Sequence, residues 1–160
     1  MNPLRIAIVD DDPFVAAHLG IALGERLPGA ELYTIEEPVA PAGFDVYVID
    51  NDFGGRAFGG ELHDRIRALA PDALILAYSA QLDTPFLRRL MRGGARDAYD
   101  KESPADRQAL VLAIVEEHER LRSGRPRAPQ ARRGTIAAVT ALLREWNLRL
   151  GTHAAPESVE

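Results

Sequence analysis

The sequence predicts an α/β fold, a doubly wound five-stranded parallel sheet followed by one C-terminal helix. Three observations predict it. Five short apolar runs have strand character, and helical patterns separate most of them, as in parallel sheets that are covered on both faces. After the last of these patterns comes a segment rich in Pro, Gly and Arg, and then one more amphipathic stretch.

The five expected strands are short and mostly apolar. They cover residues 4–9, 30–35, 45–49, 73–78 and, more weakly, 97–99. Such runs are far below the roughly 20 apolar residues that span a bilayer, so we expect no transmembrane segment.

The expected helices begin at recognisable start signals. Asp12 and Pro13 provide an N-cap and a first-turn proline for a helix that runs to about residue 27. Three further helical patterns cover residues 60–70, 84–93 and 103–122, and the last two open on Thr-Pro and Ser-Pro. Residues 36–44 are too few for an ordinary parallel crossover, so we expect a shortened helix or a loop there.

The chain divides into a domain over residues 1–122, a basic linker over 123–134, and an amphipathic helix with a disordered tail over 135–160. A length of 160 residues suits one domain with an appendage and is too short for two ordinary domains. The final helix is expected at 135–150, where one face carries Ile136, Val139, Leu142, Leu143, Trp146 and Leu150.

The composition is typical of a soluble globular protein, with 46% hydrophobic and 27% charged residues. The chain has no cysteine, which excludes disulfide and thiol chemistry and favours a cytoplasmic location. The net charge of -5 argues against general nucleic-acid binding. We interpret the six arginines between Arg120 and Arg133 as a solvated linker.

Polar side chains follow four of the expected strands. Asp10, Asp11 and Asp12 follow the first and Asp50 the third, while Ser79 follows the fourth and Lys101 the fifth. In a doubly wound sheet the ligand site lies outside the carboxyl ends of the strands, so we expect these groups at one edge.

This set of groups suits phosphoryl transfer to a carboxylate. Clustered carboxylates repel one another unless a cation joins them, and oxygen ligands suit Mg²⁺. A carboxylate beside such an ion can attack phosphorus, while Lys101 neutralises and Ser79 hydrogen-bonds the phosphoryl oxygens. Asp12, before Pro13, is interpreted as a helix cap.

Four motifs, "IAIVDDDP", "FDVYVIDND", "ILAYSA" and "GGARDAYDK", resemble the receiver domain of two-component response regulators over residues 4–122. The resemblance implies the flavodoxin-like strand order 2-1-3-4-5. It implies Asp50 as phosphoacceptor, Asp10 and Asp11 as the acid pair, and Mg²⁺ bound by Asp11, Asp50 and the backbone carbonyl of Asp52. Ser79 and Lys101 match the family's hydroxyl and lysine.

The sequence departs from that pattern at its switch positions. The aromatic residue usual three places before the lysine is Ala98, with Tyr99 one place later, and the proline that often follows the lysine is Glu102. The loop after Asp50 lacks the proline that is common in the family, and it is one or two residues longer than is usual there. We therefore expect an intact phosphorylation site with altered coupling.

The resemblance implies a receiver that is phosphorylated by a sensor histidine kinase or phosphotransfer protein and that hydrolyses its own phosphoryl group, without being an enzyme otherwise. With about 38 residues after the domain and no built-in effector, output is expected through a protein partner or a homodimer, using the 135–150 helix. One alternative is a phosphorylation-independent scaffold. Another is a phosphatase, because Asp50-Asn51-Asp52 also resembles the Asp-x-Asp motif of haloacid-dehalogenase-type enzymes.

Overall fold

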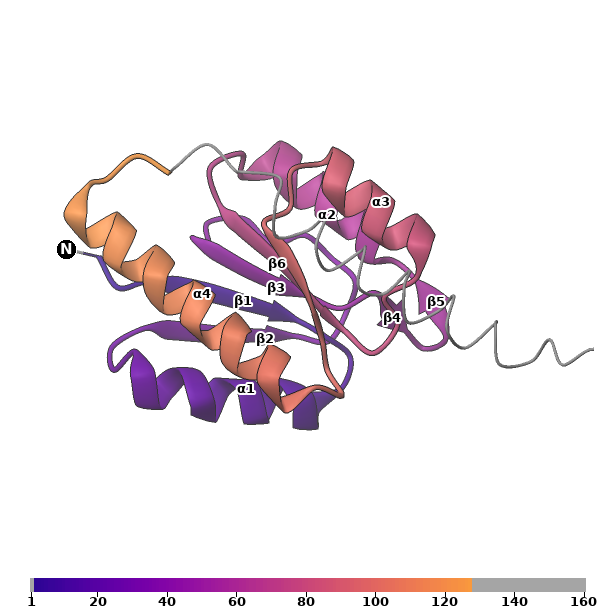
Figure 1. The fold of residues 1–160 in the computed structure, drawn as a ribbon, viewed down its shortest axis with the longest axis horizontal. Coiled ribbons are helices and arrows are strands. Elements are labelled where there is room, and N and C mark those ends of the chain that lie inside the picture. Colours follow the sequence, from indigo (N-terminus) through magenta and orange to yellow (C-terminus); the bar gives the residue numbers. More distant parts are fainter. Residues whose placement is uncertain (1, 128–160) are drawn as a thin grey trace, which may run out of the picture.

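Five parallel strands form one sheet in the computed structural model, which describes residues 2–127. They are β1 (Arg5–Val9), β2 (Glu31–Ile35), β3 (Val46–Ile49), β6 (Leu74–Ser79) and β7 (Asp97–Asp100). Their order is β2-β1-β3-β6-β7, which confirms the predicted order 2-1-3-4-5 (Figure 1). All five strands lie within a residue of their predicted bounds.

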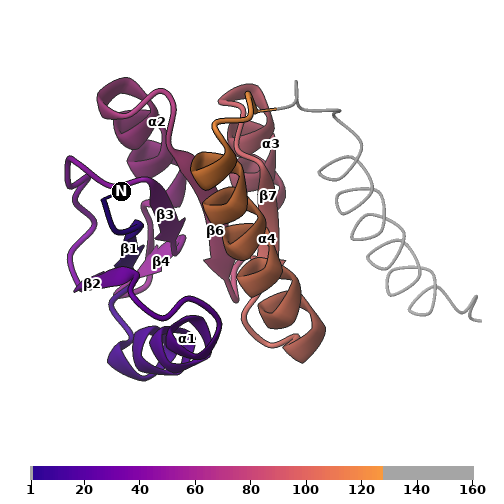
Figure 2. The same ribbon diagram turned by 90° about the vertical axis from the view of Figure 1, so that its left-hand side faces the viewer.

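Four helices cover the two faces of the sheet: α1 (Pro13–Arg26), α2 (Gly59–Leu69), α3 (Thr84–Arg92) and α4 (Pro104–Ser123). One apolar cluster joins α1 and α4 to alternate residues of the strands, among them Ile8, Val48 and Leu76. The intervening strand residues point to the opposite face, where they pack against α2 and α3. Two helices thus lie on each face (Figures 1 and 2).

The caps predicted for α1 and α4 are present. The Asp12 carboxylate accepts a hydrogen bond from the Phe14 backbone N–H at 2.9 Å, and the Ser103 hydroxyl accepts one from the Asp106 N–H at 3.2 Å. Gly124 ends α4 in the left-handed conformation, with a φ of 63°. Asp12 is therefore a cap, as expected.

Residues 36–44 form a loop and not a shortened helix. Aromatic side chains cover the sheet edge there: the Phe44 ring lies 5.1 Å from the Tyr33 ring and 5.8 Å from the Tyr47 ring, and the Arg5 guanidinium stacks on it at 4.8 Å. Because no helix within residues 2–127 covers this edge, β2 stays largely exposed.

A small hairpin that the sequence did not predict follows the phosphoacceptor candidate. Its strands, β4 (Asp52–Phe53) and β5 (Arg56–Ala57), pair antiparallel. Gly54 and Gly55 join them with φ of 61° and 82°, the conformation that a two-residue hairpin turn needs. The longer loop after Asp50 is therefore an ordered element.

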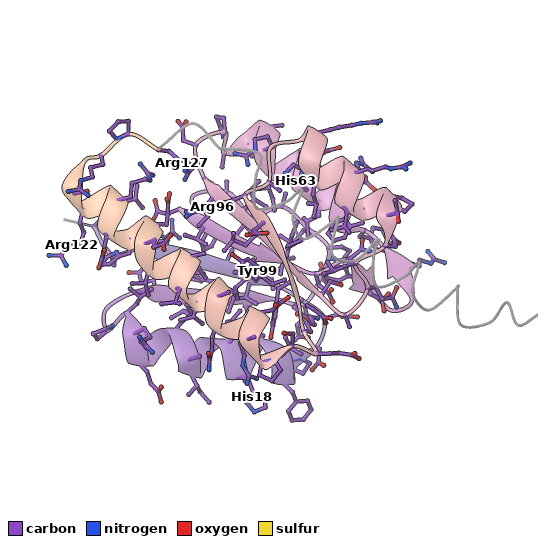
Figure 3. All side chains as sticks on the ribbon, viewed as in Figure 1. His18, His63, Arg96, Tyr99, Arg122 and Arg127 are labelled. Atoms are coloured by element: carbon purple, nitrogen blue, oxygen red, sulfur yellow. The ribbon has the colours of Figure 1, made fainter. Side chains whose placement is uncertain are left out.

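Glu117 of α4 is only 1% exposed and pairs with two arginines, Arg120 of the same helix and Arg127 of the predicted linker. Arg120 donates two hydrogen bonds of 2.8 Å to this carboxylate, and Arg127 pairs with it as well. Burial opposes the charged form, but the hydrogen bonds from both arginines lower the pKa of Glu117. The first residues of the segment predicted as a linker thus lie on the domain (Figure 3).

The predicted helix at 135–150, the rest of the linker and the disordered tail fall outside the described residues. Within residues 2–127, no helix is both long enough and apolar enough to cross a membrane.

Candidate functional site

The predicted site residues meet at the carboxyl edge of the sheet. Asp10 follows β1, Asp50 follows β3, Ser79 is the last residue of β6, and Lys101 follows β7. The strands run parallel, with Val9 opposite Ile49 and Ile49 opposite Ala77, so their ends lie side by side. Asp10, Asp50 and Ser79 are buried.

Three carboxylates form the centre of the site. Asp10, Asp11 and Asp50 each place an oxygen within 4.8 Å of the others. Asp10 and Asp50 are 2% and 4% exposed, whereas Asp11 faces solvent. Burial raises the pKa of Asp10, although its hydrogen bond with Lys101 acts in the opposite direction. A set of carboxylate oxygens open to water on one side fits a hard divalent cation such as Mg²⁺.

Lys101 joins two of these carboxylates. Its Nζ lies 2.7 Å from Asp10 Oδ2 and 2.7 Å from Asp50 Oδ2. Burial opposes the charged form, but the hydrogen bonds to both acids raise the pKa of Lys101. The ammonium is therefore held in its charged form between the Asp10 and Asp50 carboxylates.

Two loops border the acid cluster. Asp11 Oδ2 accepts a hydrogen bond from the Gly54 N–H at 2.9 Å, which ties the β4–β5 hairpin to the end of β1. The Asp52 side chain accepts one from Gln81 Nε2 at 3.3 Å. Asp52 itself opens β4, next to the cluster, and the role of its backbone carbonyl as a metal ligand stays a prediction.

Ala98 and Tyr99 point to opposite faces of β7. Ala98 packs with Ala77 and the inner side of α3, whereas Tyr99 packs in the cluster of α1 and α4 (Figure 3). Burial raises the pKa of Tyr99, and the neighbouring Asp97 adds to the effect. Because side chains alternate along a strand, Tyr99 lies on the face opposite to Ala77 and cannot replace an aromatic ring at position 98.

Asn51 and Gln81 are site neighbours that the sequence did not single out. Asn51 is 1% exposed and follows Asp50, whose Oδ1 accepts a hydrogen bond from the Asn51 N–H at 2.6 Å. Its side chain donates to the Gln81 carbonyl at 3.0 Å and accepts from the Gly59 N–H at 3.2 Å. An asparagine in a loop is usually solvated, so its residue type does not indicate a buried role. The only signal in the sequence is its position beside Asp50.

The chain is similar in sequence to a curated regulatory protein and in fold to solved response regulators. No protein-family model matches the chain. The methanol utilization control regulatory protein MoxX of Paracoccus denitrificans is 30% identical over 112 residues, which are 64% of this chain and 49% of that protein. The chain thus spans about half the length of this curated relative.

Solved structures show the fold over most of the chain. A CheY-like response regulator receiver domain protein from Methanospirillum hungatei superposes with a TM-score of 0.63 at 17% identity, covering 76% of this chain and 98% of that one. A response regulator from Burkholderia pseudomallei, solved with a phosphorylated aspartic acid and a calcium ion, has a TM-score of 0.56 at 19% identity, covering 79% and 77%. The chain therefore has the fold of the receiver domains of response regulators.

Proposed function

We propose that the protein is a two-component receiver that accepts a phosphoryl group on Asp50 from a sensor histidine kinase or a phosphotransfer protein. The observation that carries this proposal is the meeting of Asp10, Asp11, Asp50 and Lys101 at one sheet edge, with Ser79 buried at the end of the adjacent strand. The solved relative from Burkholderia pseudomallei that carries a phosphorylated aspartic acid supports it.

In the proposed reaction an Asp50 carboxylate oxygen attacks the phosphorus of the donor. A bond forms between that oxygen and phosphorus, and the bond from phosphorus to the donor breaks, which leaves the donor with the electron pair. Lys101, already 2.7 Å from Asp50 Oδ2, balances the charge of the phosphoryl oxygens, and the Ser79 hydroxyl donates a hydrogen bond to one of them.

Asp11 and Asp50, with Asp10 beside them, would hold a magnesium ion. The ion supplies positive charge at the phosphoryl oxygens when it is bound. Hydrolysis of the aspartyl phosphate by the protein itself is part of the proposal, and so is a cytoplasmic location.

Intact-mass spectrometry after incubation with acetyl phosphate and Mg²⁺ tests the proposal. We expect one phosphoryl adduct on the wild type, its absence in Asp50→Asn, and its retention in Asp12→Asn, because asparagine still caps α1. An unmodified wild type would favour the phosphorylation-independent scaffold. Continuous turnover of added phosphoesters would favour the phosphatase.

We further propose that output passes through a protein partner or a homodimer that uses residues 135–150. The apolar side chains at helical spacing in this segment support it. A chain ending after Arg127 keeps the contacts of Arg127 and Arg120 with Glu117 and therefore stays folded. We expect light scattering and partner capture to differ between the full chain and this shorter one. Identical behaviour of the two would exclude an output role for the segment.

A further inference from the structure

Three hydrogen bonds, joined through the Gln81 backbone and the Asn51 side chain, connect Ser79 to the start of α2. Ser79 Oγ accepts a hydrogen bond from the Gln81 N–H at 3.1 Å, and the Gln81 carbonyl accepts one from Asn51 Nδ2 at 3.0 Å. Asn51 Oδ1 in turn accepts one from the Gly59 N–H at 3.2 Å. The path therefore joins the hydroxyl on one side of Asp50 to a helix on the other side.

The two ends of the Asn51 side chain bind different elements. The amide nitrogen reaches the loop between β6 and α3, whereas the oxygen and the backbone carbonyl both accept from the first turn of α2. Asn51 is 1% exposed, so water does not compete for these bonds. A shift of the β6–α3 loop relative to Asp50 therefore acts on the first turn of α2 through the Asn51 side chain, beside the apolar contact of α2 with α3.

The helices α2 and α3 pack too closely to shift independently. A Cβ at Gly59 would lie 2.7 Å from the Phe86 ring and 2.8 Å from the Asn51 Cα, and one at Gly93 would lie 2.1 Å from the His63 ring. Asp64 and Arg89 add an ion pair of 2.8 Å between the two helices. The start of α2 is thus in contact with Asn51 and α3 at once.

Among residues 2–127, β7 has no comparable side-chain hydrogen bond to α2 or α3 on this face. Ala98 is its inward residue there and ends at a methyl group, packed on the apolar side of α3. The Tyr99 ring lies on the other face with α1 and α4. In this part of the chain, the polar contacts that leave the site toward α2 and α3 therefore run through residues 51 and 81.

We propose that Asn51 is a positioning residue that transmits the phosphoryl state of Asp50 to α2 and α3, a role that rests on the proposed function. When Ser79 Oγ is drawn to a phosphoryl oxygen, the Gln81 backbone follows it. The Asn51 amide follows the Gln81 carbonyl, and the first turn of α2 moves with its α3 contact. The face formed by α2 and α3 is then a surface that changes with the phosphoryl state of Asp50.

Hydrogen exchange on the full chain tests this role, with beryllofluoride and Mg²⁺ as the probe of the phosphorylated state. In the wild type we expect the probe to slow exchange in residues 59–69 by roughly fivefold or more, which is the low end of ordinary coupling energies. In Asn51→Ala we expect the exchange rates of residues 59–69 with and without the probe to be nearly equal, while the phosphoryl adduct from acetyl phosphate still forms.

Gln81→Ala is the matched control, because it removes only the side chain and keeps the backbone N–H and carbonyl of the path. We expect it to retain the wild-type response. Phe86→Leu, which loosens the α2–α3 contact without touching a polar group of the site, is the second variant if Asn51→Ala does not fold. We expect it to reduce the response in residues 84–92.

The outcomes separate this inference from the proposed function. A wild-type response in residues 59–69 of Asn51→Ala, with adduct present, would overturn the positioning role and leave the receiver function standing. A wild type that forms no adduct and shows no response to beryllofluoride would overturn both. A response lost equally in Asn51→Ala and Gln81→Ala would overturn the role of Asn51 by assigning the coupling to the Gln81 side chain.

Discussion

Lys101 is the one cation within ion-pair distance of Asp10 and Asp50 in the part of the chain that the structure describes. One ammonium does not balance three neighbouring carboxylates, and the raised pKa of Asp10 reflects the cost of burying its charge. The site is therefore arranged to gain stability from a further cation.

Added Mg²⁺ should raise the melting temperature of the wild type, because an ion that binds only the folded state stabilises it. At roughly 100 times its Kd the gain is about 2.7 kcal/mol. Asp11→Asn removes a carboxylate of the cluster and should lose most of the gain. Asp12→Asn, the cap control, should keep it. Thermal unfolding with and without the ion measures the effect, and an equal gain in both variants would argue against this site.

At the scale of single elements, the glycines of the chain have different roles. A Cβ added at Gly20, inside α1, would have no atom within 4 Å, whereas Gly59 opens α2 against Asn51 and Phe86. The first glycine only weakens its helix. The second is required by the close approach of α2 to α3.

Replacing these two glycines by alanine should therefore have opposite effects on the free energy of unfolding. Gly20→Ala should stabilise the protein by about 0.5–1 kcal/mol, the ordinary gain inside a helix. Gly59→Ala should destabilise it by about 1–3 kcal/mol, because the new methyl group meets backbone as well as a ring. Urea unfolding measures both values, and a neutral Gly59→Ala would mean that α2 can move away from α3 freely.

At the scale of the whole molecule, two buried ionisable groups make the fold sensitive to acid. His63 is 0% exposed between α2 and α3, and burial lowers its pKa against the opposing hydrogen bond with Asp64 (Figure 3). Its Nε2 has no hydrogen-bond partner in residues 2–127, so a proton there would be unsatisfied. Burial opposes the charged form of Glu117, yet its pKa is lowered in the folded state because Arg120 and Arg127 bind the carboxylate.

Both shifts have the same consequence for stability. As the pH falls, His63 takes up a proton in the unfolded chain before it does so in the folded one. Its contribution to the free energy of unfolding is therefore fully present above about pH 6.5 and decreases as the pH falls from there. The contribution of Glu117 to the free energy of unfolding is fully present above the pKa of the unfolded chain, and it is lost as the pH falls through the lower pKa of the folded state. Acid therefore destabilises the protein in two successive ranges.

The loss of stability that begins at about pH 6.5 should disappear in His63→Leu. The free energy of unfolding, measured in urea at about pH 7.5 and about pH 5.5, should fall in the wild type and change much less in this variant. His18→Leu, at an exposed position on α1, should behave as the wild type. If His63→Leu lost as much stability as the wild type over this interval, a different group would be responsible.

The sequence by itself determined the order of the elements, the five strands and the residues that meet at their ends. This was possible because strand length, helix caps and the ends of parallel strands depend on local patterns, and Asp10, Asp50, Ser79 and Lys101 each stand at such an end. The loop at 36–44 was predictable only as one of two outcomes, because a nine-residue segment with two prolines can form either.

Only the tertiary structure decided which side chains act across elements. The burial of Asn51 between the β6–α3 loop and α2, the contact of His63 with Gly93 and the pairing of Glu117 with Arg127 all join residues whose spacing shows no local period. The β4–β5 hairpin forms a separate two-stranded sheet, and the register of β7 with β6 decides that Ala98 points to the same face as Ala77. Local patterns thus fix where the site is built, and long-range packing fixes how it connects to the rest of the domain.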